Sequence, residues 1–297
     1  SEIFCPQYVS PGGMLRYSTS DAKIPHIQSE YAHIMGNSLG NFQDYWDVIE
    51  QNPKLQGGFI WEWIDQSIDT VKNGKRIKAY GGDFPLEGPV DENLSDNNFC
   101  VKGVVDAYRN LTPMAGEIKK VYQHIKTKWK GNNSVNIKNG YFFKSLDNVM
   151  LRWVLQENGL SKETGTIGSI ALLPQQENDI LIPIKSVQQS DKEYQLNIYY
   201  VLKTDEPFLP KDFEIAAEQF LLKMLPAGTV NPSTRSTIKI QQNEVQCSIN
   251  GKNFSILFDL KNGILVNYKL NGEEVMQQGP IPSFWRAPTD NDIGAGF

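Results

Sequence analysis

Residues 24–63 hold most of the side chains that could do chemistry. Glu30 ends a short apolar run, and Tyr31 and His33 follow it directly. A second apolar run, from Leu55, ends in the Trp61-Glu-Trp sequence. A sugar site needs a carboxylate for bond cleavage, polar donors for hydroxyl groups and an aromatic face for C–H surfaces. The combination therefore points to carbohydrate chemistry.

The spacing of apolar residues predicts the elements that would position this chemistry. Leu39, Phe42, Trp46 and Ile49 recur at helical spacing, so residues 38–51 are predicted to form an amphipathic helix. The apolar runs on either side of it are predicted strands. A strand, helix, strand order is typical of a parallel sheet, in which functional residues lie at the carboxyl ends of the strands. Glu30, Trp61 and Glu62 occupy such ends.

Each residue also has an ordinary structural interpretation. A glutamate at a strand end is most often a solvated loop carboxylate. Tyr8, which follows the short run Ile3-Phe-Cys-Pro, could be a half-buried packing residue. His33 could be a hydrogen-bonding residue at the helix entry, and Trp61 could belong to a core. Residue types alone leave these alternatives open.

The exact amino-acid sequence of this stretch decides between the structural and the functional interpretations. SEYAHIMGNSLGNFQDYW followed by LQGGFIWEWIDQS resembles the C-terminal half of the catalytic barrel of family 2 glycoside hydrolases, in particular the large microbial β-galactosidases. Ala32-His33 favours the galactosidase branch over related β-glucuronidases. The resemblance implies hydrolysis of terminal β-galactosides with retention, with Glu30 as the nucleophile and Tyr8 hydrogen-bonded to it.

The resemblance also assigns substrate contacts. It implies that His33 contacts sugar hydroxyls, that Trp61 forms an apolar platform and that Phe99 lines the C6 pocket. Glu62 matches no catalytic residue and is expected to be structural. The acid/base glutamate of the family lies on an earlier barrel strand and would precede Ser1, so this chain alone is expected to be inactive.

One position departs from the family pattern at its sodium site. That site uses the Phe carbonyl and the Asn side chain of an F-C-x-N-G segment, whereas this chain has Phe99 followed by Cys-Val and then Lys102-Gly. Lysine has no acceptor, so its ammonium could occupy the place of the cation, and sodium is not expected. The family's magnesium ligands would lie mostly before Ser1. We therefore expect no cofactor within this chain and magnesium only in the full-length parent.

The chain is expected to have a multidomain architecture, α/β followed by all-β. Residues 1–125 resemble the C-terminal part of a (β/α)₈ TIM barrel. Alternation of apolar residues, as from Tyr194 to Leu202, predicts an immunoglobulin-like β-sandwich over residues 126–226. Residues 227–237 are predicted to be a linker. Residues 238–297 resemble the start of a further β-domain, the small-chain-type domain of β-galactosidases.

Composition limits the partners. The 297 residues carry a net charge of −5 with both signs interspersed, which argues against nucleic acid and anionic membranes. The expected partners are a β-galactoside or oligosaccharide and the remainder of the parent polypeptide, with homo-oligomerisation as a further expectation because a partial barrel exposes sheet edges. The compartment stays open between the cytoplasm and periplasm of a bacterium. Two alternatives stay open: a family 2 enzyme for a β-glucuronide or β-mannoside, and a non-catalytic carbohydrate-binding module.

Overall fold

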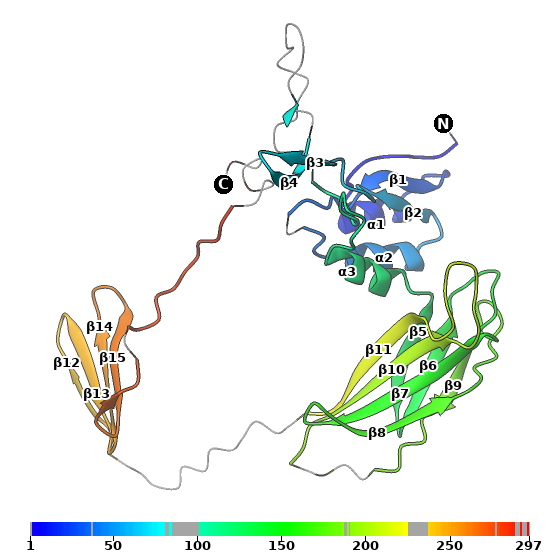
Figure 1. Ribbon diagram of the computed structural model, residues 1–297. Helices are drawn as coiled ribbons and strands as arrows, with labels where there is room; N and C mark the ends of the chain where they lie inside the picture. The colour runs from blue at the N-terminus through cyan, green and yellow to red at the C-terminus, as the bar shows by residue number, and fades with distance from the viewer. Residues whose placement is uncertain are drawn as a thin grey trace, which may run out of the picture. The chain divides into compact units, whose positions relative to one another are not determined.

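The structure, a computed structural model, describes residues 2–36, 38–80, 83–84, 101–186, 189, 191–224, 237–276, 278–288, 292 and 296 (Figure 1). The chain forms two compact units. One comprises Ser1–Leu225 with Pro288–Phe297, and the other comprises Pro226–Ala287. No helix in the described ranges is long and apolar enough to cross a membrane.

Parallel strands form the first part of the larger unit. Phe4 and Gln7 pair in parallel with His26 and Glu30, and the strand of Glu30 pairs in parallel with the next strand. The elements of this part are α1 (Pro11–Thr19), β1 (His26–Tyr31), α2 (Phe42–Gln51), β2 (Leu55–Ile60) and α3 (Met114–Tyr122). The order of strand, helix and strand matches the parallel sheet predicted from the sequence.

The parallel array continues past the end of β2. Ile64 pairs in parallel with Val105, and between these segments the chain forms an antiparallel hairpin of β3 (Ile68–Lys72) and β4 (Lys75–Ala79). Within the described residues this array is open and does not close into a barrel. It corresponds to the partial barrel that the sequence predicts.

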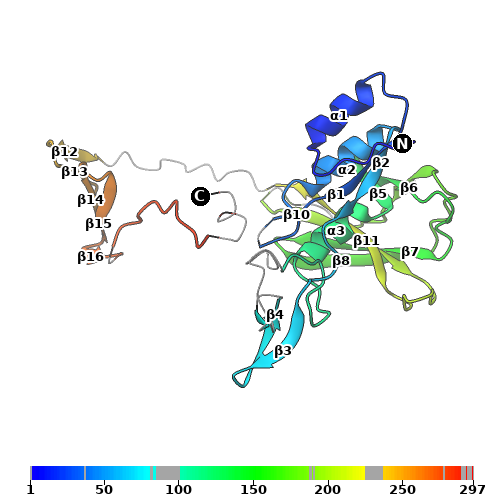
Figure 2. The same cartoon turned by 90° about the horizontal axis from the view of Figure 1, so that it is seen from above.

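Helices cover the array through an aromatic core. Buried Tyr31, the last residue of β1, packs against Phe42 of α2, and its hydroxyl lies 2.7 Å from that of Tyr122 in α3. The indole N–H of Trp46 also donates to the Tyr31 hydroxyl, at 3.1 Å. Helices α1 and α2 lie next to each other, and α2 lies against β2 (Figure 2). This packing fixes the direction in which β1 presents its other side chains.

The helix predicted over residues 38–51 begins later, at Phe42. The Ser38 hydroxyl accepts from the backbone N–H of Met35 and donates to the carbonyl of His33. Leu39 and Asn41 then adopt positive φ angles of 75° and 56°. The polar residues that suggested a helix start therefore form a turn in front of the helix, because serine and asparagine hydrogen-bond backbone groups equally well in turns.

Two antiparallel sheets follow in the described residues of the larger unit. The first has the order β5-β6-β9 and the second β11-β10-β7-β8. Their inner faces share one core, in which alternate residues of β7 and β10 are buried, as the alternation in sequence predicted. The strands are β5 (Ile125–Gly131), β6 (Ser134–Asn139), β7 (Val149–Glu157), β8 (Leu160–Ile167), β9 (Glu177–Leu181), β10 (Tyr194–Leu202) and β11 (Glu214–Lys223).

The smaller unit is a five-stranded antiparallel sheet. No side chain is buried in its described residues from 237 onward, so its apolar face has no covering layer there. Its first strand is short and mostly polar, so it lacks the apolar alternation that would predict it from the sequence. The predicted linker lies outside the described residues except for Thr237. The strands are β12 (Lys239–Gln242), β13 (Gln246–Asn250), β14 (Phe254–Asp259), β15 (Ile264–Leu270) and β16 (Glu273–Glu274).

Candidate active site

Glu30 lies at the carboxyl end of β1, where two side chains of the neighbouring segment hold both of its oxygens. The Tyr8 hydroxyl donates to one carboxylate oxygen at 2.7 Å, and the Gln7 side-chain amide donates to the other at 3.0 Å. Hydrogen bonds to an ionised carboxylate are stronger than those between neutral groups. The arrangement therefore fixes the orientation of Glu30 and stabilises its negative charge.

Tyr8 reaches Glu30 through an unusual backbone conformation. Its backbone N–H donates to the carbonyl of Glu30 at 2.9 Å, and its φ angle is 50°. A non-glycine residue in the left-handed region costs about 1–2 kcal/mol. Burial and the hydrogen bond to Glu30 raise the pKa of the Tyr8 hydroxyl above its usual range. The hydroxyl therefore stays protonated, and remains a donor, at neutral pH.

The pairing of β1 with β2 is irregular close to Glu30. Gln28 and Tyr31 are three residues apart, yet both contact Gly58 on the same side of the sheet. Strict alternation would put them on opposite faces, but the register between β1 and β2 shifts between these two residues. Tyr31 thus packs among the helices while the side chain of Glu30 meets Gln7 and Tyr8.

His33 and Trp61 lie close to this pair. The ring of His33 makes an edge contact with Tyr8, with centroids 6.2 Å apart. Burial lowers the pKa of His33, the charge of Lys102 lowers it further, and the charge of Glu30 opposes both. Trp61 pairs with the end of β1, donating its backbone N–H to the carbonyl of Tyr31 at 3.2 Å. The peptide bond between Trp61 and Glu62 is cis.

Two ionisable residues, Lys102 and Glu62, lie next to Trp61. Lys102 is only 5% exposed, and its Nζ lies 5.8 Å from the centroid of the Trp61 ring. The backbone N–H of Glu62 donates to the Lys102 carbonyl at 3.2 Å. Burial raises the pKa of Glu62, and the charge of Lys102 opposes that increase. A buried cation thus lies near the Trp61 ring, and its charge acts on His33 and Glu62.

The Lys102 side chain supplies no ligand to a sodium ion at this position. A sodium ion needs oxygen ligands, and the Lys102 side chain offers three donors and no acceptor. In the part of the chain that the structure describes, no three His, Cys, Asp or Glu side chains gather into a metal-binding group. Phe99, predicted to line the sugar pocket and to stand at the position that supplies a carbonyl to sodium in the family, lies outside the described residues.

The structure adds one residue that the sequence analysis missed. Gln7 is a second side-chain partner of Glu30, at 3.0 Å against 2.7 Å for Tyr8, because the two occupy adjacent positions at the end of one strand-like segment. The sequence signal that could have identified Gln7 is its position next to Tyr8. Side chains of consecutive residues normally diverge, and here the left-handed backbone at Tyr8 lets both reach the same carboxylate.

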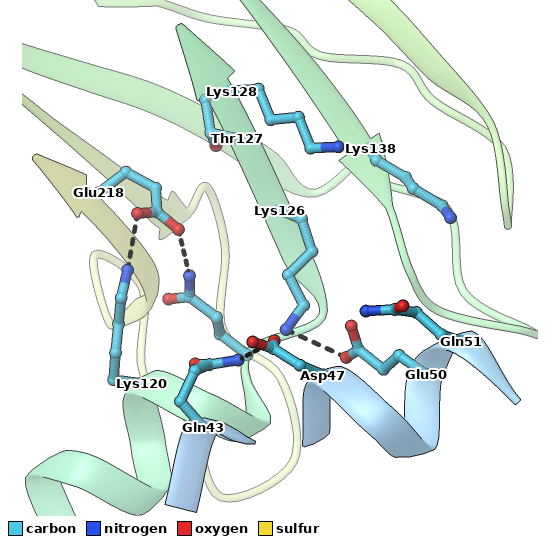
Figure 3. Close-up of a pocket in the computed structure, with 11 residues that line it drawn as sticks. Gln43, Asp47, Glu50, Gln51, Lys120, Lys126, Thr127, Lys128, Lys138 and Glu218 are labelled. Carbon is cyan, nitrogen blue, oxygen red and sulfur yellow. Dashed lines mark hydrogen bonds and ion pairs between the residues drawn. The ribbon is translucent and has the colours of Figure 1, made fainter. Parts of the chain in front are cut away.

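A cavity of about 540 Å³ lies away from this site. It lies between α2, α3 and the strands β5, β6 and β11, and none of Tyr8, Glu30, His33 or Trp61 lines it. Some of its polar residues bond to each other: Lys120 and Gln123 with Glu218, and Lys126 with Glu50 (Figure 3). This cavity is a polar junction between the helices and the two-sheet part.

Comparison with known proteins gives three family matches in order along the chain. Residues 12–127 match the model described as glycosyl hydrolases family 2, TIM barrel domain. Residues 135–223 match β-galactosidase, domain 4, and residues 250–297 match the β-galactosidase small chain. These segments fall on the parallel array, the two antiparallel sheets and the C-terminal part of the chain.

Curated relatives align over nearly the whole chain. A β-galactosidase of Priestia megaterium is 33% identical over 99% of this chain, which covers 28% of the relative. A β-galactosidase of Pseudoalteromonas haloplanktis is 30% identical over 99% of this chain, which covers 30% of that relative. A β-galactosidase of Halalkalibacterium halodurans is 34% identical over 99% of this chain, which covers 28% of that relative. The chain thus spans less than a third of the length of these relatives. The resemblance predicted from residues 24–63 is confirmed: along its length the chain matches a domain of glycosyl hydrolase family 2 and two domains of β-galactosidases.

Proposed function

We propose that this chain supplies the nucleophile and part of the sugar site of a retaining β-galactosidase. The observation that carries the proposal is the pair of hydrogen bonds from Gln7 and Tyr8 to the two oxygens of Glu30. They leave the carboxylate oriented and charged, as a nucleophile must be. The names of the relatives support a galactoside as substrate.

The proposed reaction has two steps. The carboxylate of Glu30 attacks the anomeric carbon, the bond to the leaving oxygen breaks, and that oxygen takes a proton from an acid on the opposite side of the bond. A galactosyl ester of Glu30 results. The same acid, now a base, then takes a proton from water, whose oxygen attacks the anomeric carbon and releases Glu30. His33 would bind sugar hydroxyls, and Trp61 would contact the C–H face.

The rest of the enzyme is proposed to come from outside this chain. The acid/base glutamate would lie on another part of the parent polypeptide, so residues 1–297 alone would not turn over substrate. Magnesium, if used, would be bound in the full-length parent. The open sheet edges of the parallel array, with exposed Phe59 and Trp63 nearby, would be covered by the remainder of the polypeptide or by a second subunit.

We also propose the predicted domain division: a TIM-barrel part at 1–125, an immunoglobulin-like sandwich at 126–226, a linker at 227–237 and a further β-domain from 238. The strand orders β5-β6-β9 and β11-β10-β7-β8 support the sandwich type, because immunoglobulin-like folds pack two such antiparallel sheets face to face. The sheet of the smaller unit, whose described side chains are not buried, fits an incomplete β-domain.

The test of the function uses the full-length parent and a 2-deoxy-2-fluoro-β-galactoside with a good leaving group. The fluorine slows hydrolysis of the ester, so the covalent adduct accumulates and can be mapped by mass spectrometry. We expect the label on the peptide that contains Glu30. A label on another residue would refute the assignment. Absence of a label, without turnover of galactosides, glucuronides or mannosides, would instead favour a carbohydrate-binding protein.

Replacing Tyr8 by phenylalanine tests the hydrogen bond to Glu30. A hydrogen bond to a charged group contributes about 1.5–3 kcal/mol, so kcat/KM of the full-length Tyr8→Phe variant should fall by roughly 10- to 150-fold. Tyr17→Phe is the matched control, because the Tyr17 hydroxyl donates to the backbone carbonyl of Ile24, at 3.0 Å. Equal effects of the two substitutions on kcat/KM would refute the role of Tyr8.

A further inference from the structure

We propose that the side-chain amide of Gln7 joins the nucleophile to the substrate: its N–H donates to Glu30, and its carbonyl oxygen accepts a hydrogen bond from the 2-hydroxyl group of the sugar. The inference rests on the proposed function and deepens it. It makes Gln7 a substrate-binding residue as well as a partner of Glu30. It also restricts the substrate to β-glycosides whose 2-hydroxyl lies on the face of the ring that Glu30 attacks.

The backbone fixes Gln7 beside Glu30. The two residues form a parallel β-bridge. On one side of Gln7 in the chain, the carbonyl of Pro6 accepts from the N–H of Ser29 at 2.9 Å, and on the other side Tyr8 donates to the carbonyl of Glu30 at 2.9 Å. The position of Gln7 relative to the nucleophile is therefore set by backbone pairing as well as by its own side chain.

The charge of Glu30 determines which way the amide of Gln7 points. An ionised carboxylate only accepts hydrogen bonds, and only the NH₂ end of an amide donates them. The Gln7 nitrogen lies 3.0 Å from one carboxylate oxygen of Glu30, so the carbonyl oxygen of the same amide points elsewhere. In the part of the chain that the structure describes, no donor bonds to this oxygen, and Gln7 is exposed. Next to the nucleophile, an acceptor is thus open to a ligand.

The place of the nucleophile identifies the group that this acceptor can reach. During attack, a carboxylate oxygen of Glu30 lies about 3–3.5 Å from the anomeric carbon, so the amide of Gln7 comes close to the atoms next to that carbon. One of them is the ring oxygen, which only accepts hydrogen bonds. The other is C2, whose hydroxyl group is a donor. The 2-hydroxyl is therefore the sugar group that matches the open acceptor of Gln7.

The configuration at C2 decides whether this contact forms. Glu30 attacks the face of the ring opposite the leaving group. In a β-galactoside the 2-hydroxyl is equatorial and inclined toward that face, whereas in a β-mannoside it is axial and points to the other face. Hydrogen bonds to the 2-hydroxyl strengthen in the transition state of glycoside hydrolysis. The contact therefore favours galactosides over their C2 epimers, and its loss should lower kcat more than it raises KM.

The first experiment measures coupling between Gln7 and the 2-hydroxyl in the full-length parent. Wild type and Gln7→Met are assayed on an aryl β-galactoside, on its 2-deoxy form and on its C2 epimer. Methionine keeps the length of the side chain but removes both donor and acceptor. We expect Gln7→Met to lower kcat/KM by on the order of 10- to 100-fold on the galactoside. On the other two substrates the loss should be about 3- to 10-fold smaller, because the variant and the altered substrate remove the same hydrogen bond.

A matched control separates this contact from a general effect of replacing glutamine. The Gln43 amide also donates to a carboxylate, that of Asp47 at 2.8 Å, but in the cavity that lies away from this site. Gln43→Met should leave kcat/KM on all three substrates unchanged. If Gln7→Met does not fold, as judged by its thermal unfolding midpoint, Gln7→Ala is measured in the same way. Equal losses on the three substrates would overturn the inference.

Mapping of the covalent label separates this inference from the proposed function. A label on Glu30 together with equal losses would refute the role of Gln7 and leave Glu30 as the nucleophile. A label on another residue would overturn both. Hydrolysis of β-mannosides in place of β-galactosides would also overturn both, since their 2-hydroxyl lies on the face away from Glu30. If β-glucuronides are hydrolysed instead, the galactoside proposal fails, and the corresponding glucuronides decide the role of Gln7 by the same comparison.

Discussion

Full-length parent enzyme with Glu30 replaced by glutamine should lose kcat by at least about 10⁴-fold, the scale seen when a catalytic nucleophile is removed. Glutamine has nearly the same shape and can still accept the hydrogen bond from Tyr8. Its amide carries no negative charge and does not form the glycosyl ester. The substitution therefore removes the chemistry while the contacts that position the side chain largely remain. The measurement is kcat on an aryl β-galactoside together with the midpoint of thermal unfolding, which should change little.

Glu50→Gln is the matched control for that substitution. Glu50 forms an ion pair with Lys126 at 3.1 Å, and both side chains are partly solvated. Such pairs contribute about 0–1 kcal/mol to stability, so this variant should keep wild-type activity. A Glu30→Gln enzyme that retains more than a tenth of wild-type kcat would contradict the assignment. Loss of covalent labelling in Glu62→Gln but not in Glu30→Gln would also contradict the assignment, since Glu62 is the other carboxylate of the described site.

Sequence patterns predicted the elements around the site better than the orientation of its side chains. Apolar runs and their spacing indicated β1, α2 and β2, because local periodicity reflects which face is buried. The orientation of Glu30 depends on the register shift between Gln28 and Tyr31, which is set by pairing with a strand far along the sequence. Gln7 was missed for the same reason, since the left-handed turn at Tyr8 has no glycine to signal it.

Two further differences arise from what the local sequence does not contain. Polar residues before Phe42 suit a turn and a helix cap equally, so the start of α2 was predicted four residues too early. Trp63 is of a residue type that is usually packed in a core, yet it is 60% exposed. Its partners would belong to the part of the barrel outside this chain. Local patterns identify an apolar residue, whereas the surface that covers it is a property of the whole fold.

Gly103→Ala should have the second largest effect, although Gly103 contacts no substrate. A Cβ atom at this position would lie 2.5 Å from the carbonyl oxygen of Val105 and 2.7 Å from the carbonyl carbon of Ile64. Both are backbone atoms, which cannot rotate away as a side chain can. The N–H of Gly103 also donates to the buried carboxylate of Asp65 at 2.6 Å. Relief of the overlap therefore requires separation of the pairing that holds Lys102 next to Glu62.

We expect Gly103→Ala to destabilise this part of the full-length parent by about 3 kcal/mol, the upper range for overpacking. That corresponds to a fall of roughly 6–12 °C in the unfolding midpoint of a unit of this size. A displacement of about 1 Å at Lys102 and Glu62 would also lower kcat/KM on the order of 100-fold.

Gly116→Ala is the control, because Gly116 lies in α3 with no atom within 4 Å of the added Cβ. Alanine in a helix is favoured over glycine by about 1 kcal/mol, so that variant should be as active as wild type and at least as stable. If Gly103→Ala is equally well tolerated, the tight pairing of residues 102–105 with 62–65 does not determine the geometry of the site.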